Sequence, residues 1–128
     1  MENIIKVLIV DDSVFARKVV ADIVSSSPKL SVVGTANNGR EAISLVDKLK
    51  PDVITMDIEM PELNGLDTLK VIMEKKPTPV VMLSSLTTAG AKESLLALKS
   101  GAVDVMAKPH GSHSLGLTAQ RDELIGKI

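Results

Sequence analysis

The stretch VLIVDDSV, residues 7–14, places four consecutive apolar residues directly before two neighbouring aspartates, Asp11 and Asp12. Three of the four apolar residues are β-branched, which favours a buried β-strand. Neither aspartate adjoins a basic residue in the sequence. A buried strand that ends in two like charges therefore needs a compensating positive group near its end.

The chain has 128 residues and a mass of 13.6 kDa, which fits one domain with a sizeable core. Cysteine is absent, which excludes disulfides and thiolate chemistry and suits a reducing compartment, so we expect a cytoplasmic location. Fifteen basic and sixteen acidic residues give a net charge of -1, and Phe15 is the only aromatic residue. This composition argues against nucleic-acid binding, and no apolar run is long enough for membrane insertion.

Five short apolar segments alternate with segments of helical spacing. The predicted strands are IIKVLIV from Ile4, LSVVGTA from Leu30, VITM from Val53, PVVML from Pro79 and AVDVMA from Ala102. Apolar residues recur at helical spacing within residues 16–24, 42–46, 66–73 and 95–98. The alternation predicts an α/β fold with a doubly wound parallel sheet. Apolar positions between Leu117 and Ile128 indicate a fifth helix or the start of a linker.

Chemically active side chains stand where these strands end. They are Asp11 and Asp12 after the first strand, Asp57 after the third, Ser84 and Ser85 after the fourth, and Lys108 after the fifth. Ligands of open parallel sheets bind beyond the carboxyl ends of the strands. If the first and third strands are neighbours, their ends lie about 4.8 Å apart. Three carboxylates would then form one cluster.

Such a cluster needs a counter-charge, because two carboxylates about 4 Å apart repel by about 4 kcal/mol at a surface-like dielectric. A few oxygen ligands with room for water suit Mg²⁺, and a lysine opposite would pair with an anion on that ion. Metal, lysine, hydroxyl and carboxylate nucleophile together indicate phosphoryl transfer.

Each of these residues also has an ordinary structural interpretation. Asp12 or Ser13 would cap the first helix, Asp57 would begin a turn, and the serine pair after the fourth strand would cap the fourth helix. Lys108 alone would be a solvated surface charge. The joint position of all of them at one sheet edge favours a functional site. By contrast, His110 and His113 are interpreted as loop residues, because a third zinc ligand is missing.

These residues resemble the receiver domain of bacterial response regulators over nearly the whole chain. The resemblance rests on the acidic pair, on Asp57 followed by IEMPELNG, on Ser84, and on Lys108 followed by Pro109. Three stretches, DIEMPELNGLDTL, PTPVVMLSSLT and GAVDVMAKP, resemble the receiver of the chemotaxis protein-glutamate methylesterases, the CheB family. The resemblance implies a (βα)5 flavodoxin-like fold whose five parallel strands have the order 2-1-3-4-5.

The resemblance also implies a metal-dependent phosphorylation site. Asp57 would accept a phosphoryl group from a phosphohistidine on the chemotaxis histidine kinase, CheA. Asp12, Asp57 and the main-chain carbonyl of Glu59 would bind Mg²⁺ directly, and Asp11 would act through a coordinated water.

Other positions would sense the phosphoryl group. The resemblance implies that Lys108 contacts the phosphoryl oxygens and that Ser84 moves its hydroxyl toward the phosphoryl group. It also implies a cis peptide between Lys108 and Pro109. Many receivers carry an aromatic switch residue in the fifth strand, where this chain has Val105. An aromatic rotamer switch therefore cannot operate here, and coupling would pass through Ser84 and the segment after it.

We expect residues 1–113 to form the receiver core through the fifth strand and following loop. Residues 114–128 would form the fifth helix and the start of a linker to an absent effector domain, as in a regulatory domain cut from a longer protein near Ile128. The fragment would catalyse only its own phosphorylation and dephosphorylation. In the family, the unphosphorylated receiver obstructs the attached methylesterase (hydrolase) domain, which acts on chemoreceptors, and phosphorylation relieves the block.

Two other functions remain open from the sequence. A free-standing single-domain receiver would share every site residue. An aspartyl-phosphate phosphatase would use Asp57 as nucleophile and Glu59 as the acid two residues on. Those enzymes carry the nucleophile on the first strand of the catalytic unit, whereas Asp57 follows two complete β-α units, which disfavours this alternative.

Overall fold

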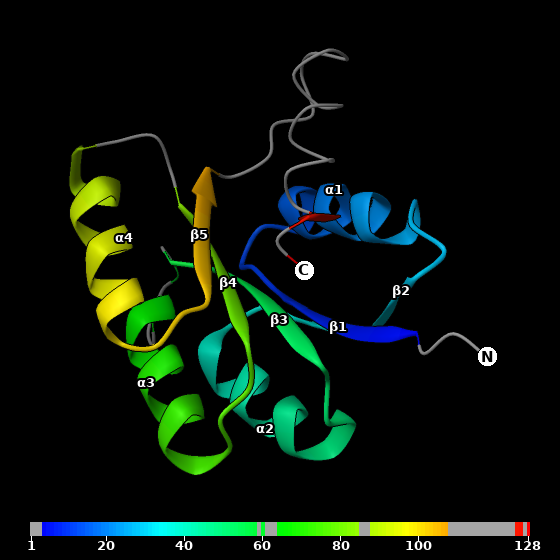
Figure 1. Cartoon of the computed structure of the whole chain (residues 1–128), viewed down its shortest axis with the longest axis horizontal. Coiled ribbons are helices and arrows are strands. Elements are labelled where there is room, and N and C mark those ends of the chain that lie inside the picture. The colour runs from blue at the N-terminus through cyan, green and yellow to red at the C-terminus, as the bar shows by residue number, and fades with distance from the viewer. Residues whose placement is uncertain (1–3, 59, 61–63, 85–87, 108–124, 127) are drawn as a thin grey trace.

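A computed structural model describes residues 4–58, 60, 64–84, 88–107, 125, 126 and 128, and the side chains within these ranges except 88–91, 93, 94 and 107. A twisted parallel sheet runs through the molecule with helices on both faces (Figure 1). The strands are β1 (Ile5–Val10), β2 (Leu30–Ala36), β3 (Val53–Asp57), β4 (Val80–Ser84) and β5 (Asp104–Ala107). The helices are α1 (Val14–Ser25), α2 (Gly39–Leu49), α3 (Gly65–Lys75) and α4 (Thr88–Lys99).

The strand order is β2-β1-β3-β4-β5, which confirms the predicted doubly wound, flavodoxin-like topology. All four strand pairs are parallel. β1 and β3 are neighbours, with Val10 opposite Met56, so Asp11 follows one strand where Asp57 ends the other. The condition on which the carboxylate cluster depends is therefore met.

The sheet buries both of its faces, which explains why its strands are continuously apolar instead of alternating. One hydrophobic cluster includes Leu8 and Met56 and packs against α2 and α3, and the other includes Val7 and Ile9 and packs against α1. Ile125 and Ile128, two positions of the predicted C-terminal stripe, are partly buried against the α1 cluster. Of the predicted segment 114–128, residues 114–124 and 127 lie outside the described residues.

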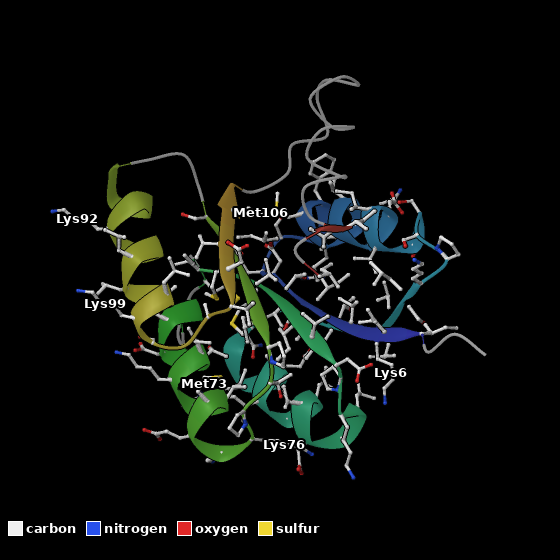
Figure 2. All side chains as sticks on the ribbon, in the orientation of Figure 1. Lys6, Met73, Lys76, Lys92, Lys99 and Met106 are labelled. Carbon is white, nitrogen blue, oxygen red and sulfur yellow. The ribbon has the colours of Figure 1, made fainter. Side chains whose placement is uncertain are left out.

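The outer side of α4 combines charge with apolar surface. Lys92 and Lys99 extend away from the sheet (Figure 2), and Leu95, Leu96 and Leu98 are exposed on the same helix. Within the part of the chain that the structure describes, no helix is long and apolar enough to cross a membrane.

Thr55 is a polar residue in the middle of the central strand. It stands opposite Ile9 of β1 and Val81 of β4, and its side chain is fully buried. Its hydroxyl has no hydrogen-bond partner among the described residues. A buried hydroxyl without a partner keeps its full desolvation cost.

We therefore predict that Thr55→Val raises the free energy of unfolding by about 1 kcal/mol, because valine keeps the shape and removes the hydroxyl. Urea unfolding would measure the change. The matched control is Thr68→Val: the Thr68 hydroxyl is equally buried but donates to the Asn64 carbonyl at 2.8 Å, so this variant should lose stability. A loss of stability in both variants would contradict the prediction.

Candidate functional site

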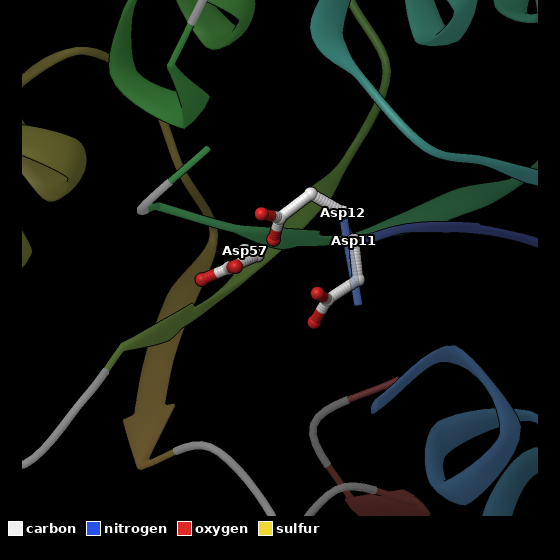
Figure 3. Close-up of side chains that lie close together, drawn as sticks. All are labelled: Asp11, Asp12 and Asp57. Carbon is white, nitrogen blue, oxygen red and sulfur yellow. The ribbon is translucent and has the colours of Figure 1, made fainter. Parts of the chain in front are cut away.

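Three carboxylates from two strand ends converge at the carboxyl edge of the sheet. One oxygen each from Asp11, Asp12 and Asp57 can be chosen so that all three lie within 4.8 Å of one another (Figure 3). The side chains of Asp11 and Asp57 are 1% and 2% exposed, whereas Asp12 is exposed. Two acids of the site are therefore buried, and the third is exposed to solvent.

The turn between β1 and α1, residues 11–13, is fixed by several hydrogen bonds. The Asp11 amide donates to Ala36 of β2 at 3.0 Å, and the Ser13 amide donates to Asp11 Oδ1 at 2.9 Å. Ser13 is the N-cap of α1, because its hydroxyl accepts from the Ala16 amide at 3.2 Å. Of the two capping candidates in the sequence, Ser13 takes that role, so Asp12 keeps its carboxylate at the site.

Arg17 adds a bond to this turn that the sequence did not suggest. Its Nη1 donates to the main-chain carbonyl oxygen of Asp11 at 2.7 Å. Arg17 lies four residues after the N-cap Ser13, so its side chain starts one helical turn from the acidic pair. That spacing is the only sequence signal that would have pointed to it.

The backbone of the Asp57 segment is held from both sides. The Ile58 amide donates to Leu83 of β4 at 3.1 Å, and the Gly65 amide at the start of α3 donates to the Ile58 carbonyl at 2.8 Å. A Cβ at Gly65 would clash with the main-chain oxygen of Asp57 and lie 2.7 Å from the Ile58 Cα. Sequence reasoning missed Gly65, although a glycine that opens a helix directly after the capping Asn64 hints at close backbone packing.

Of the remaining predicted site residues, the structure describes Ser84 but not Glu59 or Lys108. Ser84 is the last residue of β4, is 4% exposed, and directly follows Leu83, the register partner of Asp57, so it lies at the same edge of the sheet as the acids. Glu59, Lys108 and the Lys108–Pro109 peptide lie outside the described residues, so the structure does not test their predicted roles.

The donor set fits a hard divalent cation. All three side chains offer oxygen, which Mg²⁺ prefers, and the exposure of Asp12 leaves room for the water that Mg²⁺ retains. Such an ion would offset the mutual repulsion of the carboxylates, about 4 kcal/mol for a pair of charges 4 Å apart at a surface-like dielectric.

The strand order and the acidic cluster at the carboxyl edge of the sheet are typical of regulatory receiver domains. The response regulator receiver domain matches residues 7–119, and the chain belongs to that family. Within it, the chain resembles the receiver domains of CheB-type chemotaxis methylesterases. It is 55% identical over 124 residues to the protein-glutamate methylesterase/protein-glutamine glutaminase of Geobacillus kaustophilus, a match that covers 97% of this chain and 36% of that protein. The corresponding protein of Archaeoglobus fulgidus is 56% identical over 123 residues, with 96% and 35% covered.

Solved structures of receiver domains have the same fold as this chain. The response regulator domain of Thermotoga maritima CheB is 54% identical, with a TM-score of 0.86 over 98% of this chain and 93% of that one. A chain from the complex of the CheA3 P1 domain with CheY6 of R. sphaeroides is 32% identical, with a TM-score of 0.75 over 97% and 98%. The chain spans about a third of the length of the curated relatives that it matches.

Because Gly65 touches the Asp57 backbone, Gly65→Ala should displace the end of β3. We expect it to lower the free energy of unfolding by about 2 kcal/mol, although alanine is otherwise favoured over glycine in a helix. Chemical denaturation would measure this. Gly126→Ala is the control, because a Cβ there meets nothing within 4 Å among the described residues, and this variant should be neutral or slightly stabilised. Unchanged stability in Gly65→Ala would show that β3 tolerates the extra atom.

Because the three carboxylates repel one another, Asp12→Asn should raise the Tm in metal-free buffer by about 3 °C. Added Mg²⁺ should raise the Tm of the unmodified chain more than that of the variant, since the variant lacks one ligand. Differential scanning calorimetry with and without MgCl₂ tests both points. Asp22→Asn, an exposed change of equal charge on α1, should respond to Mg²⁺ like the unmodified chain. Equal Mg²⁺ responses of all three proteins would exclude Asp12 as a ligand.

Proposed function

We propose that the chain is a phosphorylation-controlled receiver in which Asp57 accepts a phosphoryl group from a phosphohistidine of a chemotaxis histidine kinase, CheA, in a Mg²⁺-dependent reaction. The convergence of Asp11, Asp12 and Asp57 carries the proposal. Asp57 is the last residue of β3, the central strand of the sheet, so neighbouring strands on both sides fix the backbone that carries its carboxylate. Its small exposure would limit the access of water to the aspartyl phosphate once it has formed.

The transfer has a simple balance of bonds. A carboxylate oxygen of Asp57 attacks phosphorus, a P–O bond forms, and the P–N bond to the donor imidazole breaks. The imidazole nitrogen recovers the electron pair and takes a proton from solvent. Asp12, Asp57 and the Glu59 carbonyl would hold Mg²⁺, with Asp11 acting through a water, and the ion would supply positive charge to the phosphoryl oxygens.

Two further residues would then respond to the modified acceptor. Aspartyl phosphate carries about two negative charges, which would attract the Lys108 ammonium and the Ser84 hydroxyl. Ser84 is buried at the end of the strand next to β3. A movement of its hydroxyl would be transmitted to α4 through the segment between them. Val105 is partly buried against the core on β5, which supports a coupling route without an aromatic switch.

Two related solved structures support the proposed phosphoryl donor and the proposed metal. One similar chain comes from a complex of a CheA3 P1 domain with CheY6, and another from a CheX–CheY–BeF₃–Mg complex of Borrelia burgdorferi. The curated relatives are methylesterases about three times as long as this chain. We infer that, in such a longer protein, this receiver controls a C-terminal methylesterase domain that acts on chemoreceptors.

Incubation with acetyl phosphate and Mg²⁺ should give a phosphoryl adduct, visible by intact mass analysis and absent in Asp57→Asn. Asp47→Asn, an exposed change of the same kind on α2, should keep the adduct. Removal of Mg²⁺ with a chelator should abolish labelling of the unmodified chain.

Fast release of inorganic phosphate without a trapped adduct would favour the phosphatase alternative. An adduct that persists in Asp57→Asn would assign the acceptor to another residue.

A further inference from the structure

The bond from Arg17 reaches the peptide that joins the two acids of the β1–α1 turn. Its Nη1 donates to the carbonyl oxygen of Asp11 at 2.7 Å, and this carbonyl belongs to the peptide between Asp11 and Asp12. The donor is charged, the bond is short, and the contact is partly buried, all of which strengthen it. Arg17 thus restricts rotation of that peptide.

We propose that Arg17 is a positioning residue for the magnesium site, an inference that rests on the proposed function. Other bonds fix the Asp11 amide and the Asp11 carboxylate, but those bonds do not hold the carbonyl. Rotation of the peptide changes ψ of Asp11 and φ of Asp12 together, and so redirects the Asp12 side chain. Because Asp12 is exposed, its carboxylate takes its place chiefly from the backbone that carries it.

A purely electrostatic role would act in the opposite direction. A guanidinium near a divalent cation repels it, so loss of this charge alone should tighten Mg²⁺ binding. Loss of an orienting bond should weaken binding, because groups that orient metal ligands contribute strongly to metal affinity. A purely structural role should lower the unfolding temperature and leave the Mg²⁺ affinity of the folded protein unchanged. The sign of the change in affinity separates the three roles.

The experiment is a titration of the ¹⁵N-labelled 128-residue chain with MgCl₂, followed by amide resonances at a temperature where every variant is folded. We expect Arg17→Met to weaken Mg²⁺ binding about 10-fold. Arg17→Lys should fall between this variant and the unmodified chain, because lysine keeps the charge but lacks the planar fork. Lys18→Met, an equal loss of charge at the next, exposed position of α1, should bind as tightly as the unmodified chain or more tightly.

Equal or tighter Mg²⁺ binding by folded Arg17→Met would overturn the inference while leaving the proposed function intact. If that variant does not fold, Arg17→Lys decides: weaker binding than in the unmodified chain supports the positioning role, and equal binding overturns it. An unmodified chain that binds no Mg²⁺ would overturn both the proposed function and the inference.

Discussion

The mutual repulsion of three carboxylates at one edge of the sheet is the constraint around which this protein is built. Asp11 and Asp57 are almost fully buried, yet both lie within reach of a third acid. Their proximity follows directly from the adjacency of β1 and β3. A sheet packed on both faces supplies the rigidity that keeps like charges together, because movement of either strand would disturb two hydrophobic clusters.

Contacts with main-chain atoms set the position of each acid. Ser13 ends the first strand-to-helix turn as a cap, Arg17 holds the carbonyl inside that turn, and Gly65 allows α3 to approach the end of β3. These three contacts differ in chemistry but have the same effect on the backbone. Each limits a backbone freedom that would otherwise let a carboxylate move away from its neighbours, which is the preorganisation that phosphoryl transfer requires.

Residue patterns predicted the α/β fold and the strand ends that carry the acids, whereas the adjacency of β1 and β3 was predicted only by the family resemblance. Continuous β-branched runs predict buried parallel strands, and Asp11, Asp57 and Ser84 mark their ends, so the edge that carries the chemistry follows from topology. The choice between Asp12 and Ser13 as helix cap depends on turn dihedral angles that residue types do not determine. Arg17 and Gly65 escaped notice because their roles depend on contacts with main-chain atoms, for which a sequence carries no pattern. The predicted roles of Glu59 and Lys108 remain predictions.

The missing side chain at Gly65 also sets how closely α3 approaches the end of β3. Helix α3 meets the end of β3 backbone to backbone, with a hydrogen bond from Gly65 to the carbonyl of Ile58. The end of β3 cannot move closer to α3, because main-chain atoms of the two segments would then overlap. If Asp57 is phosphorylated as proposed, a displacement toward α3 would meet this contact, whereas the Ile58–Leu83 hydrogen bond connects the same segment to β4. The absence of a Cβ at Gly65 is thus what lets α3 lie directly against the backbone of the proposed acceptor.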